Sequence, residues 1–194
     1  MGLAPLLELM LLALASFGFS GMAQQSPPAS AHVWRQSQKT DSARGITYNR
    51  FTLTGKFAGE APRDVPNRPA FVVDCAPDRR SPKGRFAAGE LLVGVPLKID
   101  YVEPAEIHGT SYFPKVKVKY RLNDSKEEQV NWAPGSDKPV TSVLLTKEML
   151  KKIVRARAVQ ITANDEHGSP VVTQFDMPDP KPVVEACNMD DSKK

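Results

Sequence analysis

Four cations at alternate positions are the feature of this sequence best suited to contact chemistry. They are Lys115, Lys117, Lys119 and Arg121, and apolar residues or tyrosine stand between and after them. Side chains of a β-strand repeat every two residues, so the cations would share one face of a half-buried strand, about 7 Å apart. That face could bind an anionic polymer such as cell-wall material, lipopolysaccharide or nucleic acid. The commoner alternative is a solvated strand surface whose lysines discourage edge-to-edge pairing.

A second group of basic residues lies in a stretch typical of a turn. Pro82 and Gly84 stand within this stretch, and its cations are Arg79, Arg80, Lys83 and Arg85. Binding residues often lie on loops. The group is therefore a second candidate for contact with an anion.

Trp132 is a candidate of a different kind. It follows the polar stretch 126–129, which favours a turn. Its ring could stack on a ligand, or it could pack the edge of a sheet into the core, which is the more frequent role of such a tryptophan.

No arrangement of residues indicates catalysis. The sequence contains neither a G-x-S-x-G elbow nor a phosphate-binding loop nor a paired-cysteine zinc motif. The three histidines, His32, His108 and His167, are scattered, and Asp165-Glu166-His167 is typical of a solvated turn. A triad can assemble from distant residues, so a hydrolase is the third hypothesis. The sequence predicts a non-enzyme with no cofactor and no metal.

The N-terminal segment predicts export. Leu9–Gly18 is apolar, and Gly21-Met22-Ala23 provides small residues for cleavage before Gln24. The usual basic residues ahead of the apolar stretch are missing. A retained anchor is the alternative, but a membrane span needs about 20 apolar residues and this stretch is shorter. We therefore expect a periplasmic or secreted protein that does not span the membrane after cleavage.

The two cysteines, Cys75 and Cys187, are expected to form a disulfide. Paired thiols persist in the oxidising compartments that exported proteins reach. Two free thiols are the alternative. A zinc site is disfavoured because neighbouring histidine ligands are lacking.

Composition divides the chain into four parts. Residues 1–23 are the expected signal peptide, and 24–45 form a flexible Ser/Pro/Gln-rich leader with a possible first strand. Residues 46–190 form one β domain, and 191–194 are a disordered tail. The 17 prolines argue against a helical protein, because an interior proline breaks a helix.

Short extended segments separated by turns predict a mainly β fold, an antiparallel β-sandwich-like single domain. The expected strands are 46–53, 70–73, 86–93, 115–122, 158–163 and 171–175. One internal helix is expected from the capping residue Thr146 to about Arg155, with an apolar stripe of Met149, Leu150, Ile153 and Val154. A short C-terminal helix opening at Asp179-Pro180 would carry Cys187 back to Cys75.

Three pieces of the domain also match a known pattern. They are PAFVVDC (69–75), VKYRLN (118–123) followed by Trp132 and Ser136-Asp137, and TQFDM (173–177) followed by VEAC (184–187). Their order over residues 46–190 resembles that of VasI/TagO-like proteins, a family of small exported proteins associated with type VI secretion. Asn123 stands where that family usually has Asp, and residues 97–112 look like an insertion. The resemblance implies an accessory or binding protein with a disulfide-braced β fold.

These observations predict a non-enzymatic exported accessory or interaction protein of the cell envelope. Its partner would be another envelope protein or an anionic cell-wall component, and nucleic acid is not expected. The alternative is a binding module for an anionic glycan or lipid head group through the two basic clusters. The formal net charge of +4 fits an anionic partner, or solubility alone.

Overall fold

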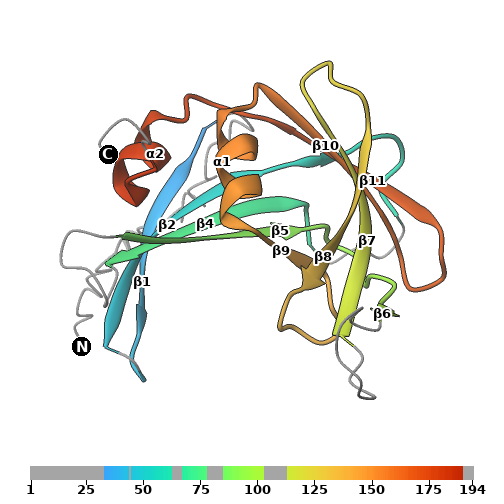
Figure 1. Cartoon of the computed structure of the whole chain (residues 1–194), viewed down its shortest axis with the longest axis horizontal. Helices are drawn as coiled ribbons and strands as arrows, with labels where there is room; N and C mark the ends of the chain where they lie inside the picture. The colour runs from blue at the N-terminus through green and yellow to red at the C-terminus, as the bar shows by residue number, and fades with distance from the viewer. Residues whose placement is uncertain (1–32, 44, 63–66, 78–84, 103–112, 190–194) are drawn as a thin grey trace, which may run out of the picture.

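Figure 1 shows the fold in a computed structural model, which describes residues 33–43, 45–62, 67–77, 85–102 and 113–189. The strands are β1 (Arg35–Asp41), β2 (Ile46–Thr54), β3 (Lys56–Phe57), β4 (Ala70–Pro77), β5 (Arg85–Leu92), β6 (Asp100–Val102), β7 (Phe113–Leu122), β8 (Glu128–Pro134), β9 (Ser142–Leu145), β10 (Ala158–Asn164) and β11 (Pro170–Asp176). The helices are α1 (Lys147–Arg155) and α2 (Lys181–Cys187). The predicted mainly antiparallel β fold with an internal and a C-terminal helix is confirmed. The residues predicted to be a signal peptide (1–23), the first part of the predicted leader and the predicted tail (191–194) lie outside the described residues.

The strands form one open sheet whose two ends belong to the same stretch of chain. The order is β1-β2-β4-β5-β9-β8-β7-β10-β11-β3, and β6 pairs with β7. Only Gly55 separates β2 from β3, so Ile46–Phe57 is one continuous segment. Its β2 part pairs with β4 near one edge of the sheet, and its β3 part pairs with β11 at the opposite edge. A Cβ on Gly55 would lie 2.6 Å from Phe175 Cε1, so this crossing needs glycine. The sheet folds over as a result, which gives the sandwich-like arrangement.

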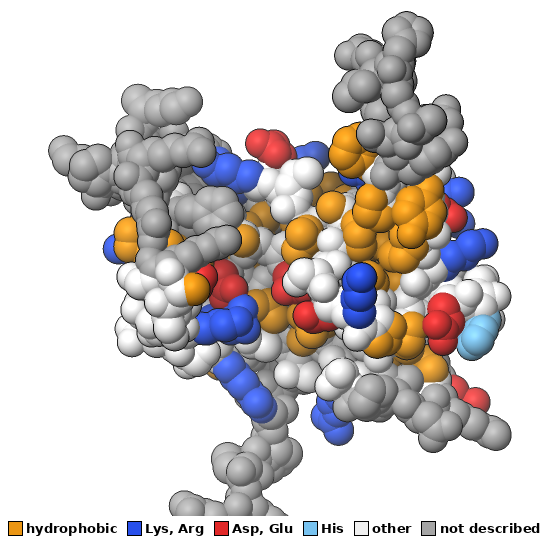
Figure 2. All heavy atoms as spheres, turned by 90° about the horizontal axis from the view of Figure 1, so that it is seen from below, with side chains coloured by type: hydrophobic (Ala, Val, Ile, Leu, Met, Phe, Trp, Pro, Cys, Tyr) orange, Lys and Arg blue, Asp and Glu red, His pale blue; other side chains and the backbone are white. Residues whose placement is uncertain are grey.

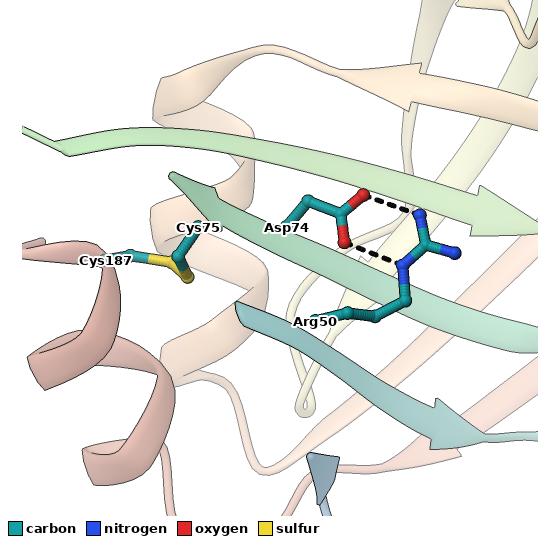
Figure 3. The surroundings of a disulfide bond; sticks show 4 residues. All are labelled: Arg50, Asp74, Cys75 and Cys187. Carbon is teal, nitrogen blue, oxygen red and sulfur yellow. Dashed lines mark hydrogen bonds and ion pairs between the residues drawn. A yellow bond between two sulfur atoms is a disulfide. The ribbon is translucent and has the colours of Figure 1, made fainter. Parts of the chain in front are cut away.

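The core lies inside this folded sheet and under the helices. Its largest fully buried side chains are Phe51, Phe71, Phe175, Leu53, Leu91, Leu150, Ile153 and Ile161. On β2, the residues next to Phe51 and Leu53 are half-buried and point the other way, as expected for a strand with one buried face. Arg50 is one of these residues and binds Asp74 of β4: its Nε donates to Oδ1 at 2.7 Å, and its Nη2 donates to Oδ2 at 2.6 Å (Figure 3). These bonds raise the pKa of Arg50 above its ordinary value and tie β2 to β4.

Helix α1 forms where it was predicted. Thr146 Oγ1 accepts a hydrogen bond from the Met149 backbone N–H at 3.2 Å, which caps the first turn. All four residues of the predicted apolar stripe are buried. The helix packs on β5 at Gly89, where a Cβ would lie 2.7 Å from Leu150 Cδ1.

The disulfide between Cys75 and Cys187 is also confirmed. It joins β4 to α2 with the two Cα atoms 5.0 Å apart (Figure 3). Two further contacts hold the C-terminal segment: Trp34 Nε1 donates to the Asp179 carbonyl at 3.2 Å, and Arg155 donates to the Met189 carbonyl at 3.0 Å. The segment 179–189 is thus fixed to β4, to Trp34 ahead of β1 and to α1 by covalent and polar bonds.

Two stretches bear on expectations that the sequence left open or that the structure corrects. β1 lies in the segment expected to be a flexible leader with a possible first strand, and it pairs with β2 over its whole length. The polar stretch 126–129 was predicted to be a turn, but β8 already begins at Glu128. Pairing of Glu128 and Gln129 with β7 explains the difference, because ladder hydrogen bonds extend the strand into polar sequence.

Candidate binding surface

Strand β7 has the alternating arrangement that the sequence indicated. Val116, Val118 and Tyr120 are buried, whereas Lys117, Lys119 and Arg121 are exposed on the opposite face. Lys115 is half-buried, and its position on β7 is directly opposite Asp100 of β6. Three of the four cations therefore project into solvent from one strand.

The neighbouring strands surround these cations with uncharged amides. In an antiparallel sheet, directly opposed residues share a face. Lys117 is opposite Asn131, Lys119 is opposite Gln129, and Arg121 is opposite Gln160, which is opposite Gln174 of β11. We call this surface the cationic sheet face; it consists of Lys117, Lys119, Arg121, Gln129, Asn131, Gln160 and Gln174.

The charges of this face are only partly paired. Lys119 Nζ lies 3.6 Å from Glu127 Oε1, an exposed contact of the kind that contributes little to stability. Lys117 and Arg121 have no ion-pair partner among the described residues. At the edge of the face, Lys56 of β3 lies opposite Gln174 and its Nζ is 3.2 Å from Asp176 Oδ2. Two cations are therefore available for an anionic ligand.

A shallow depression of about 210 Å³ lies at the Arg121 end of the face. Arg121, Gln160 and Gln174, which are directly opposed across three strands, line it, and so do Asn123 and Asp176, each two residues further along the chain. Ala158, opposite Asp176, has only a methyl side chain and also lines the depression.

Asn123 is a residue that the sequence analysis noted only as a departure from a family pattern. It follows β7 with a left-handed backbone (φ 53°), a conformation that asparagine tolerates better than most residues. Its Oδ1 accepts hydrogen bonds from the backbone N–H groups of Arg157 at 2.6 Å and Ala158 at 3.2 Å. The side chain thereby holds the start of β10 against the end of β7.

Trp132 belongs to the core. It is 4% exposed and stacks on Tyr120, with the ring centroids 5.9 Å apart and an interplanar angle of 23°. Of its two interpretations, the packing role is the one that this geometry supports, and we leave Trp132 out of the candidate surface.

The second basic cluster can be placed only in part. Arg79, Arg80 and Lys83 lie outside the described residues, whereas Arg85 is exposed at the start of β5. Two strands, β9 and β8, separate β5 from β7 in the sheet. The structure therefore does not bring Arg85 into the cationic sheet face.

The face seen from below the view of Figure 1 carries a different mixture of side chains. Figure 2 shows apolar side chains gathered on that face, with acidic and basic side chains among and around them. The exposed apolar residues include Tyr101 and Phe113, at the end of β7 where β6 pairs with it. Such a mixture does not attract one sign of charge, so the cationic sheet face is the better candidate for an anion.

The acidic turn at 165–167 has a structural role. Asp165 Oδ1 accepts hydrogen bonds from the backbone N–H groups of His167 at 3.0 Å and Ser169 at 2.7 Å. These bonds close the connection between β10 and β11. Within the described ranges, no three His, Cys, Asp or Glu side chains gather as a metal site would require.

Tyr120 gives a prediction on pH. Burial is the main cause that raises its pKa to about 12, and the hydrogen bond from its hydroxyl to Glu128 adds to it. The unfolded chain has the ordinary tyrosine pKa of about 10. The folded state therefore binds the proton more tightly, and the stability present below pH 10 is lost as the pH rises from 10 to 12. A titration of phenolate absorbance should show a transition near pH 12 that Tyr120→Phe removes; an unchanged titration would contradict the assignment.

No family model, curated protein or solved structure that was compared with this chain matches it. The likeness to VasI/TagO-like proteins therefore depends on the sequence segments alone. Neither helix of the described structure is long and apolar enough to cross a membrane.

Proposed function

We propose that this protein is a non-enzymatic exported interaction protein of the cell envelope, periplasmic or secreted, and that it binds an anionic partner on the cationic sheet face. The observation that carries the proposal is the exposure of Lys117 and Arg121 among neutral amides, with no described acid paired to either. An accessory role in type VI secretion is part of the proposal and is supported by the resemblance of the three sequence segments.

The chemistry of the face supports an anionic partner in two ways. Unpaired surface cations attract polyanions over about a Debye length, which is about 8 Å at physiological salt. Asparagine and glutamine amides then offer both donors and acceptors at short range. Another envelope protein with an acidic surface would use the charges alone, whereas an anionic glycan would also use the amides. The amides are therefore the observation that favours an anionic glycan, the second candidate, as the partner of this face.

The combined replacement of Lys117, Lys119 and Arg121 by glutamine should weaken binding to an anionic polysaccharide. We expect the triple variant to leave a polygalacturonate column at lower salt than the wild type, with a flatter dependence of retention on salt, because three attracting charges are lost. Elution salt and its slope are the measurements. The matched control replaces three exposed lysines elsewhere by glutamine, namely Lys39, Lys138 and Lys147. It should elute close to the wild type; elution like the triple variant would mean that net charge alone decides retention.

A pull-down separates the two candidate partners. The full-length oxidised protein, cross-linked gently in an envelope extract, should retain a protein or a cell-wall polymer that the triple variant does not retain. Equal retention by both proteins would contradict the proposal that the cationic sheet face is the contact surface.

A further inference from the structure

The depression at the Arg121 end of the cationic sheet face has a cation at one side and a carboxylate at the other. Arg121 and Asn123 lie at one side on and after β7, whereas Asp176 lies on β11 with β10 between them. Ala158 lies between Asn123 and Asp176 and fills little space. The depression of about 210 Å³ is open to solvent and is small, so it suits a single polar ring rather than a longer segment of a ligand.

Asn123 lines this space, and its side chain has an unused donor. Two backbone N–H groups point at one side-chain atom, which must therefore be the acceptor Oδ1. The amide nitrogen Nδ2 makes no hydrogen bond to any described residue. An aspartate would keep both backbone bonds but would present a second negative oxygen in place of the donor. Asparagine at this position thus makes the neighbourhood of Arg121 suitable for an anion.

We propose that this depression binds one carboxylate-bearing sugar unit of an acidic glycan. Arg121 and the Asn123 amide donate hydrogen bonds to the carboxylate. The amides of Gln160 and Gln174, directly opposed across β10 and β11, exchange hydrogen bonds with ring hydroxyls. The inference rests on the proposed function, and it names the ligand class and the residues that recognise it.

Asp176 distinguishes this ligand from a phosphate or a simple polyanion. Its carboxylate lines the depression and contacts Lys56 Nζ at 3.2 Å. A ligand with negative charge on every side would be repelled there, whereas a sugar hydroxyl can donate to an aspartate. A ring with one carboxylate and several hydroxyls matches both sides of the depression.

The test is a titration of the full-length oxidised protein with trigalacturonate. Calorimetry measures the affinity, and NMR of the side-chain amides shows which residues bind. We expect shifts of the Gln160 and Gln174 amide signals on binding. The fully methyl-esterified trimer should bind about tenfold more weakly or worse, because a charge-assisted hydrogen bond is replaced by a neutral one. Arg121→Gln should weaken binding by a similar factor.

Asn123→Asp is the decisive variant, because it keeps the acceptor that holds Arg157 and Ala158 and adds only a charge. It should weaken trigalacturonate binding at least tenfold. Asn164→Asp is its matched control: Asn164 is exposed at the far end of β10, about 20 Å from Ala158, well beyond the Debye length. The control should bind within about twofold of the wild type.

Several results would overturn the inference. They are equal binding by Asn123→Asp and wild type, equal binding of the acid and its ester, binding of inorganic phosphate as tight as that of the trimer, and no uptake of the trimer at millimolar concentration. If the triple variant of Lys117, Lys119 and Arg121 still loses retention on polygalacturonate in any of these cases, the proposed function stands and only the sugar site fails.

Discussion

Replacing Cys75 and Cys187 together by alanine should lower the free energy of unfolding by about 4 kcal/mol, within a range of about 2–5. The bridge closes a loop with a sequence separation of 112, so it removes much of the conformational freedom of the unfolded chain. Both residues are buried, and each truncation removes only one sulfur atom. Urea unfolding gives the free energy and shows from its slope whether more surface becomes exposed on unfolding.

Two comparisons separate the bridge from the docking of α2. Wild-type protein kept reduced should match the double variant. Val183→Ala, which truncates a buried residue of α2 but leaves the disulfide, should lose a smaller amount set by the deleted methyl groups. A double variant as stable as the oxidised wild type would show that the link does not stabilise the fold.

Leu150→Ala should cost about 3 kcal/mol, within the range of about 2–5 measured for buried leucines. Leu150 is fully buried on α1 and lies against Gly89 of β5. Its removal opens a cavity between the helix and the sheet. The exposed Leu144 is the matched control, and Leu144→Ala should change the free energy of unfolding by less than about 0.5 kcal/mol.

A double-mutant cycle tests the contact itself. Gly89→Ala alone should be destabilising, because the added Cβ would lie 2.7 Å from Leu150 Cδ1. In the Leu150→Ala background the same methyl group would enter vacated space, so the two changes together should cost less than their sum. Strict additivity would mean that Leu150 does not pack on Gly89.

Elements with a local signal could be predicted from the sequence. Thr146 caps a run whose apolar residues recur at helical spacing, so α1 could be located almost to the residue. The alternation along β7 likewise predicts one buried and one solvated face. β1 carries no such signal, since six of its seven residues are exposed and only its pairing with β2 makes it a strand.

The candidate site shows the same division. Lys117, Lys119 and Arg121 belong to one strand, so their common face could be predicted from β7 alone. Gln160 and Gln174 join them only through the register of β7 with β10 and of β10 with β11, which the sequence does not specify locally. Asn123 could not be recognised as a donor, because its role depends on two backbone N–H groups more than thirty residues away.

The crossing of one segment between the two ends of the sheet has a consequence for biogenesis. β3 pairs with β11, so the early segment Ile46–Phe57 acquires that neighbour only after β11 has been synthesised. Pairings between residues so distant in sequence form slowly, because the intervening chain must first be brought together. This sheet therefore completes its assembly after the ribosome has made almost all of the described chain.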